Sequence, residues 1–258
     1  MYIDSHCHLN FPQLRQQLPQ VLERMTENQV DRVLAISVSR VTFDEVFALA
    51  QAHENIYASV GIHPDDPDTP EFSVEELIER ASWPKVVGIG ETGLDHHWCK
   101  GDLTWQKNRF AAHIDAAQAT KLPLIIHTRE AGADMLAMLK SHRVEHGVIH
   151  CFTEDLAFAK AVLDMGLYLS FSGIVTFKNA KEIHEVAKYV PSDRFLIETD
   201  APFLAPMPYR GKMNEPGFVR HVGEYIAQLR DDTPENIGKI SSENFYRLFD
   251  KVPFDSHG

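Results

Sequence analysis

The sequence predicts an α/β fold, a (β/α)₈ or TIM barrel, with residues 1–258 forming a single domain. Short apolar runs alternate with amphipathic segments along the chain, the order expected of parallel strands joined by helices. Most of these runs are continuously apolar, which is typical of parallel strands buried on both faces. The alternative is a doubly wound open sheet, but no Gly-x-Gly-x-x-Gly motif follows an early strand. No Ser- or Gly-rich linker divides the chain.

Eight strands are predicted from the apolar runs. Val86-Val87-Gly88-Ile89, Leu124-Ile125-Ile126 and Phe195-Leu196-Ile197 are the clearest. The full set is Tyr2–His6, Arg32–Ser37, Ile56–Gly61, Val86–Glu91, Pro123–His127, Gly147–His150, Leu167–Phe171 and Phe195–Glu198.

Amphipathic helices are predicted between the strands. The first has an apolar stripe made of Leu14, Leu18, Val21, Leu22 and Met25. A helix over 104–120 places Phe110, Ile114 and Ala117 on one face. Other helices are indicated by their start signals, which are Thr42-x-x-Glu45, Ser73-x-x-Glu76, Thr153 with Asp155 (for a helix to about Met165), and Thr233-Pro234. The longest loop is expected over 202–217, and a loop of that length is usually functional or disordered.

The composition restricts the partners and the compartment. The chain has 258 residues and a formal net charge of −12, so no broad basic surface is available to hold a nucleic-acid duplex by its phosphates. Any nucleic-acid contact must be local or carried by metal ions. No signal peptide and no apolar stretch of about 20 residues is visible, so we expect a cytoplasmic protein, a monomer without a membrane contact. Three cysteines suit a reducing compartment, and Cys7 and Cys151 are interpreted as small core groups.

Residue types that bind metals follow the ends of most predicted strands. Catalytic residues of such barrels lie at the C-terminal ends of the strands, so these side chains should meet at one mouth. The set is His6 and His8 after the first strand, His63 after the third, Glu91 after the fourth, His127 after the fifth, His150 after the sixth and Asp200 after the eighth.

This donor set favours two divalent metal ions, Mg²⁺, Mn²⁺ or Zn²⁺. Six potential ligands exceed the three protein ligands usual for one catalytic zinc. Glu91 could bridge the ions, one held by His6, His8 and Asp200 and the other by His127 and His150. Such a pair can clamp the attacking and leaving oxygens of a phosphoryl transfer. Three cations near the mouth are candidates for holding a substrate phosphate, namely Arg129, Arg210 and Lys212.

Each of these residues also has a purely structural interpretation. Glu91 could be a turn residue bonded to backbone, His127 a core histidine with satisfied ring nitrogens, and Asp200 a helix cap or turn residue. The three cations could be solvated surface charges. His96 and His97 are candidates to line the pocket, since they follow the fourth strand closely. The other histidines are interpreted as structural or solvated, namely His53, His113, His142, His146, His184, His221 and His257.

With these motifs in place, the chain resembles the TatD family of metal-dependent deoxyribonucleases, within the amidohydrolase-like barrels. The matching stretches are Asp4-Ser5-His6-Cys7-His8-Leu9, Gly61-Ile62-His63-Pro64, Gly90-Glu91-Thr92-Gly93-Leu94-Asp95, Ile126-His127-Thr128-Arg129, Ile149-His150-Cys151-Phe152, Ser170-Phe171-Ser172-Gly173, Glu198-Thr199-Asp200 and Asn244-Phe245. The resemblance implies a (β/α)₈ barrel, divalent metals and hydrolysis of DNA phosphodiesters, often as a 3′→5′ exonuclease on single strands.

The resemblance also implies site residues. By it, the metal ligands are His6, His8, Glu91, His127, His150 and Asp200, and His63 matches a pocket position. The chain departs from the family pattern at His96-His97-Trp98, where aromatic residues are frequent, and at Ala201, where serine is frequent. Both departures concern substrate preference.

Three functions follow as hypotheses. The first is a metal-dependent nuclease acting on DNA through a two-metal site, with Asp200, Glu91 and His63 as catalytic residues. The second is a metal-dependent hydrolase of a small ester, amide, lactone or aminoacyl-ester substrate. The third is a metal-binding or partner-docking protein without turnover. A panel of phosphodiester and carboxyl-ester substrates separates them.

Overall fold

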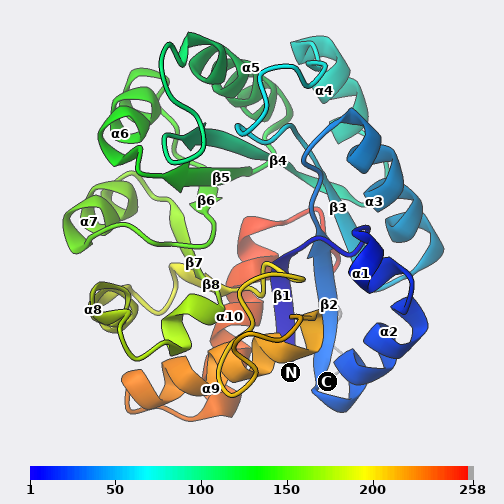
Figure 1. Cartoon of the computed structure of the whole chain (residues 1–258), viewed down its shortest axis with the longest axis vertical. Coiled ribbons are helices and arrows are strands. Elements are labelled where there is room, and N and C mark those ends of the chain that lie inside the picture. The colour runs from blue at the N-terminus through cyan, green and yellow to red at the C-terminus, as the bar shows by residue number, and fades with distance from the viewer. Residues whose placement is uncertain (255–258) are drawn as a thin grey trace.

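The computed structural model describes residues 1–254, and in it eight parallel strands form one sheet in the order β1 to β8. The sheet curls into a ring, seen end-on in Figure 1. The predicted (β/α)₈ barrel is therefore confirmed, and each predicted strand is present. The strands are β1 (Tyr2–Cys7), β2 (Val30–Ala35), β3 (Ile56–Val60), β4 (Val86–Asp95), β5 (Leu124–Arg129), β6 (Gly147–Ile149), β7 (Tyr168–Phe171) and β8 (Phe195–Ile197).

Helices surround the ring of strands (Figure 1). They bury apolar faces against the outer surface of the sheet, as a doubly covered parallel sheet requires. The helices are α1 (Pro12–Arg15), α2 (Leu18–Glu27), α3 (Arg40–Ala52), α4 (Val74–Ala81), α5 (Thr104–Thr120), α6 (Gly132–Ser141), α7 (Leu156–Asp164), α8 (Lys181–Tyr189), α9 (Val219–Leu229) and α10 (Pro234–Leu248), with two short 3₁₀ turns, η1 (Gly173–Thr176) and η2 (Pro216–Phe218).

Several helix predictions are confirmed. Helix α5 covers the predicted 104–120, with its predicted apolar face buried. Ser73 forms the predicted capping box with Glu76. Asp155 caps α7, and Thr233 caps α10 with proline in the first turn.

Two helix starts differ from the prediction. The first apolar stripe is divided between α1 and α2, because Pro19 has no N–H to donate and fits only in the first turn of a helix. Helix α3 begins at Arg40, since Ser39 is its cap and Thr42 is the third helical residue that completes the box. Glu45, predicted as the capping partner of Thr42, instead accepts a hydrogen bond from the side chain of Asn10 at 2.8 Å.

The barrel closes between β1 and β8 through contacts near their C-terminal ends. Cys7 forms a parallel bridge with Ala201, and the backbone N–H of Asp200 donates to the carbonyl of His6 at 2.9 Å. The buried carboxylate of Asp4 accepts from the backbone N–H of Thr199 at 2.9 Å. The seam of the ring therefore lies beside His6 and His8, the two predicted ligands at the end of β1.

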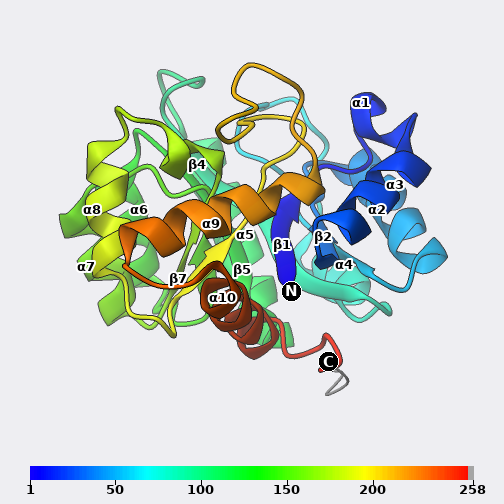
Figure 2. The same cartoon turned by 90° about the horizontal axis from the view of Figure 1, so that it is seen from below.

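One end of the barrel interior is filled with apolar side chains. Phe245, Leu248 and Phe249 of the α10 region pack beneath the strands against a buried cluster that includes Ile3 and Ile125. Figure 2 shows α10 crossing the end of the barrel opposite the gold 202–217 loop. The two ends of the same strands therefore have different roles, one closed by a helix and one surrounded by loops.

The predicted long loop between β8 and α9 is present and is tethered. Asn214 donates from its side chain to the carbonyl oxygens of Thr199 and Phe203, at 2.9 and 2.6 Å. Within residues 1–254, no helix combines the length and apolar character needed to cross a membrane. Cys7 is buried as predicted, whereas Cys151 is partly exposed beside Ser172.

Candidate metal centre

Glu91 lies at the centre of the predicted ligand set. One of its oxygens, Oε1, is 2.7 Å from Nε2 of His150 and 3.0 Å from Nδ1 of His127. The other, Oε2, is 3.3 Å from Nε2 of His6 and 3.9 Å from Nε2 of His8. One buried carboxylate thus contacts histidines from three strands, which is the position a bridging ligand needs.

The glycines of β4 explain how Glu91 reaches this position. A Cβ atom on Gly90 would lie 2.5 Å from the carbonyl oxygen of Ile125, and one on Gly93 would lie 2.0 Å from that of His127. Both have positive φ angles, of 144° and 148°, which only glycine adopts without strain. The β4–β5 register shifts between Gly90 and Thr92. A close approach and a local bulge therefore place Glu91 directly beside His127.

A second group of donors lies at the seam between β1 and β8. Oδ1 of Asp200 is 3.3 Å from Nε2 of His8 and 3.7 Å from Nε2 of His6. Asp200 takes a left-handed backbone conformation, with φ of 57°. These three donors form the group predicted for one of the two ions.

The remaining donors are grouped differently from the prediction. His150 joins His6 and Glu91, while His127 joins His63 and Glu91. Nε2 of His63 is 3.3 Å from Oε1 of Glu91. His63, predicted as a catalytic residue at a pocket position, thus lies within the donor cluster. All three groups overlap through His6 or Glu91, so the donors form one continuous centre.

The geometry fits divalent cations. Within each group the donor atoms lie within 4.8 Å of one another, and ligands of a tetrahedral ion with bonds of about 2.1 Å are separated by about 3.4 Å. Among the described residues, both ring nitrogens of His6 and Nδ1 of His8 are buried without a hydrogen-bond partner. A neutral imidazole lone pair that faces a carboxylate is repelled by it unless a cation lies between them. Mixed nitrogen and oxygen donors suit Zn²⁺ or Mn²⁺.

The protonation equilibria also reflect the need for positive charge. Burial alone would raise the pKa of Glu91, but the nearby histidines, His150 first, hold it well below its usual range. Burial alone would lower the pKa of His150, but Glu91 and Glu198 raise it well above its usual range. Burial and the neighbouring His150 lower the pKa of His6. The carboxylates therefore favour positive charge on the histidine beside them, His150.

Comparison with known proteins identifies the family. The family model described as TatD related DNase matches residues 3–250. The chain belongs to the TatD family of metal-dependent hydrolases. It is 43% identical over 252 residues to an uncharacterized metal-dependent hydrolase, YabD of Bacillus subtilis, covering 96% of this chain and 99% of the relative. It is 41% identical to a second one, YcfH of Escherichia coli, covering 96% of this chain and 95% of the relative.

Solved structures agree with the TatD assignment. The crystal structure of YjjV, a TatD homolog from Escherichia coli, superposes with a TM-score of 0.90 at 28% identity, covering 98% of each chain. A TatD family hydrolase from Entamoeba histolytica has the same fold, with a TM-score of 0.85 at 19% identity, covering 96% of this chain and 97% of that one.

The sequence did not predict the role of two carboxylates that contact histidines of the donor set. Oδ2 of Asp95 is 3.0 Å from Nε2 of His127, and Oε1 of Glu198 is 3.3 Å from Nδ1 of His150. Both carboxylates are fully buried. A carboxylate on the second ring nitrogen fixes the tautomer and raises the basicity of a ligand histidine. The sequence did contain an indication, because both residues lie in motifs that resemble those of the family. Asp95 is four residues after Glu91, and Glu198 is two residues before Asp200.

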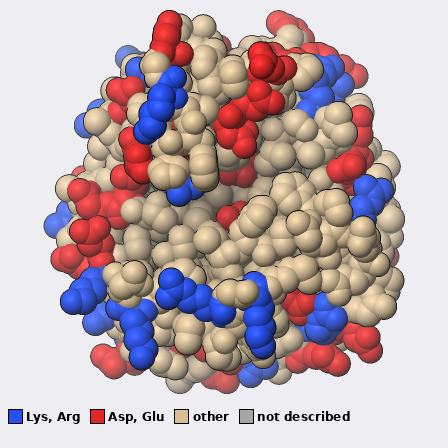
Figure 3. Space-filling view, viewed as in Figure 1, with Lys and Arg blue, Asp and Glu red and all other residues tan. Residues whose placement is uncertain are grey.

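The three predicted substrate-binding cations each lie over an aromatic ring. Within residues 1–254, none forms a hydrogen bond or ion pair with a predicted metal ligand. The Arg129 guanidinium lies 5.4 Å from the centre of the Trp98 ring, that of Arg210 4.2 Å from the Phe177 ring, and Lys212 Nζ 5.8 Å from the Tyr209 ring. Figure 3 shows a hollow in this face, with Asp or Glu side chains inside it and Lys and Arg side chains below it.

Of the other histidines, His96 and His97 lie at the mouth, whereas His113 is buried in the scaffold. His97 contacts Glu130 at 2.6 Å and His96 lies 3.9 Å from Asp134, both on the β4–α5 side of the mouth. His113 is buried in α5, where Nε2 accepts from the backbone N–H of Ile62 at 3.1 Å and Nδ1–H donates to the carbonyl of Arg109 at 2.8 Å. It is structural, as predicted. His257 lies outside the described residues.

Proposed function

We propose that this TatD-family protein is a two-metal nuclease that hydrolyses phosphodiester bonds of DNA, with single strands as its substrate. The observation that carries the proposal is the convergence of donors from the ends of six strands around Glu91 and Asp200. The match to the family described as TatD related DNase supports the same substrate.

The metal-binding roles are assigned from the three donor groups. His6, His8 and Asp200 would hold one ion, and His127 and His150, which belong to two different groups that share Glu91, would hold the other. Bound divalent ions would supply Lewis acidity and neutralise the charge of the phosphodiester. Asp95 and Glu198 keep the two histidines of β5 and β6 oriented through their second ring nitrogens.

Two side chains are placed to transfer protons. The side chains of Asp200 and His63 are each 16% exposed, against 3% for Glu91, so they can contact a substrate in the mouth. Asp200 orients the attacking water and accepts its proton. His63 has Asp65 at 3.0 Å from Nδ1, which favours the protonated ring. Burial would lower the His63 pKa, but Glu91 and Asp65 raise it to about 10, so His63 can protonate the leaving oxygen.

The test is degradation of single-stranded DNA by the purified protein. We expect cleavage with Mn²⁺, Mg²⁺ or Zn²⁺, loss of cleavage with a chelator, and recovery when the metal is returned. Glu91→Gln should lower the rate by at least about 100-fold, the size typical of removing one electrostatic group from an active site. The matched control is Glu27→Gln, at an exposed position of α2, which should cleave as the wild type does.

A parallel panel of carboxyl esters, amides and lactones addresses the alternative substrate class. Metal-dependent turnover of a carboxyl ester without loss of DNA would replace the nuclease proposal by a small-molecule hydrolase. Tight metal binding without turnover of any substrate would reject both enzymatic functions.

A further inference from the structure

We propose that two arginine–aromatic pairs, Phe177 with Arg210 and Trp98 with Arg129, hold two nucleotides of one strand on opposite sides of the metal centre. This inference rests on the proposed nuclease function and adds where the substrate lies. The first pair belongs to the β7–β8 side of the mouth and the second to the β4–β5 side, across the ring in Figure 1.

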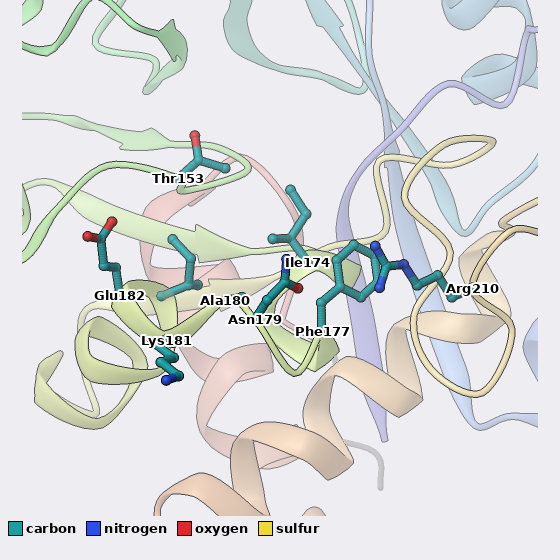
Figure 4. Close-up of a pocket in the computed structure, with 9 residues that line it drawn as sticks. Thr153, Ile174, Phe177, Asn179, Ala180, Lys181, Glu182 and Arg210 are labelled. Atoms are coloured by element: carbon teal, nitrogen blue, oxygen red, sulfur yellow. The ribbon is translucent and has the colours of Figure 1, made fainter.

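The Phe177–Arg210 pair borders a groove of about 420 Å³ outside the metal centre. Arg210 reaches from the 202–217 loop to lie over the Phe177 ring, with Thr153 and Asn179 along the same groove (Figure 4). A groove of this volume is in the range of small-ligand sites. Arg210 is exposed, so the guanidinium can stack a base or bond a phosphate, and the hydroxyl and amide can bond base edges.

Hydrogen bonds fix this pair relative to the metal centre. The backbone N–H of Met207 donates to Oγ1 of Thr176 at 2.8 Å, joining the Arg210 loop to the η1 turn that precedes Phe177. The same loop is held at its start, where the N–H of Phe203 donates to the carbonyl of Asp200 at 2.9 Å. The groove is therefore built against the strand end that carries a proposed ligand.

The Trp98–Arg129 pair is connected to the centre on the other side. The N–H of Trp98 donates to Oδ1 of Asp95 at 2.8 Å, and Oδ2 of that carboxylate contacts His127. Arg129 follows His127 by two residues on β5. Trp98 is 68% exposed, an unusual exposure for an indole, and the ring is thus free to stack on a base.

The chemistry of both pairs matches single-stranded nucleic acid. Aromatic rings stack bases of any sequence, and arginine adds phosphate contacts and a second stacking surface. The chain has a net charge of −12, so cations must be placed locally to hold a polyanion. Among residues 1–254, Glu182 is the one carboxylate that lines the groove, at the far end from Arg210 in Figure 4, and Lys181 lies next to it.

The experiment measures binding separately from cleavage. A fluorescent oligothymidylate with phosphorothioate linkages, which slow hydrolysis, is titrated with the wild type in Mn²⁺ and is checked by gel electrophoresis to be intact at the end of the titration. Trp98→Ala and Phe177→Ala should each weaken binding between about 5-fold and 150-fold, as expected for one lost base stack. Arg210→Gln should also weaken binding, which covers the case in which Phe177→Ala disturbs the loop. The wild type should bind longer oligothymidylates more tightly than short ones. This dependence on length should be lost in Trp98→Ala and in Phe177→Ala.

The matched control is Tyr189→Ala. Tyr189 is also an exposed aromatic with a cation over the ring, Lys160 at 5.1 Å, but it lies at the end of α8 that leads into β8, away from the mouth. This variant should bind the oligonucleotide as the wild type does. Equal binding by Trp98→Ala, Phe177→Ala and Tyr189→Ala would overturn the inference.

A second substrate separates failure of the inference from failure of the proposed function. Bis(4-nitrophenyl) phosphate is a phosphodiester without bases, so the ratio of oligonucleotide to small-diester turnover should fall in the aromatic variants. An unchanged ratio with active wild type would reject the two subsites and keep the nuclease. A wild type that cleaves neither phosphodiester would reject the nuclease itself.

Discussion

The two ends of the barrel use the same eight strands for opposite purposes. At the N-terminal end, Phe245 and Phe249 of the α10 region fill the interior against apolar strand residues. At the C-terminal end, Glu91 and Asp200 face histidines across distances of 2.7–3.9 Å, and buried ring nitrogens of His6 lack hydrogen-bond partners among the described residues. The side chains at the N-terminal end pack against one another, whereas the polar groups at the C-terminal end require an added cation.

This difference shows how the protein can contain an electrostatically unfavourable site. Burying unpaired polar atoms costs stability, whereas burying aromatic side chains supplies it. Because the two sets lie at opposite ends of the same strands, a change at one end should alter stability and a change at the other should alter metal binding. Three predictions test whether the two properties separate in this way.

The largest effect is expected at the apolar end. Phe249 is fully buried and packs on Phe245 at a centroid distance of 4.8 Å. Phe249→Ala should lower the free energy of unfolding by about 3–5 kcal/mol, because it leaves a cavity under the strands. Urea denaturation measures it, with Phe254→Ala, at a 64% exposed ring, as the control that should change little. Altered metal affinity in folded Phe249→Ala would show that the ends are not independent.

The next effect concerns a histidine near the mouth that belongs to the scaffold. Burial lowers the pKa of His113 from 6.5 to about 4. The unfolded chain therefore binds a proton at a higher pH than the folded chain does. The stability that His113 contributes is complete above pH 6.5 and is lost as the pH falls towards 4, by about 3 kcal/mol for this shift.

His113→Gln provides the comparison for that prediction. The variant should lose less stability than the wild type between pH 6.5 and pH 4, measured as the difference between their urea-unfolding free energies at each pH. Parallel curves for the two proteins would show that His113 is not held neutral in the folded state, and the division between scaffold and site histidines would then fail.

The smallest effect is expected from a carboxylate behind the site. Glu198 is fully buried and contacts Nδ1 of His150 at 3.3 Å. Glu198→Gln keeps an oxygen acceptor for the backbone N–H of Cys151 but removes the charge that makes His150 basic. Metal affinity should fall about 10- to 100-fold, measured by calorimetric titration of metal-free protein. An unchanged affinity together with lower stability would place Glu198 in the scaffold.

The sequence was sufficient to predict the strands and the convergence of the proposed ligands. Apolar runs bounded by polar residues identify buried parallel strands locally, and the barrel then brings every strand end to one mouth. His6, Glu91, His127 and Asp200 meet there for that reason. The sequence pattern alone does not give distances between these residues, but the barrel fold brings the strand ends together.

The predictions that were wrong concern contacts between segments that are distant in the sequence. β4 was expected to end at Glu91 but continues to Asp95, because pairing with β5 carries it past Gly93. The role of Asp95 therefore could not be assigned. The grouping of His63 with His127, with ring centres 4.4 Å apart, likewise depends on how β3 and β5 flank β4. No local pattern encodes either contact.

The position of the barrel seam has a consequence for synthesis of the protein. Asp200 reaches His6 and His8 only where the last strand closes on the first, held by the bond from its N–H to the carbonyl of His6. On the ribosome, about two hundred residues separate the emergence of these groups. A nascent chain that still lacks β8 has its first histidines and Glu91 but not the Asp200 carboxylate, so we expect hydrolysis to begin only when the ring is complete.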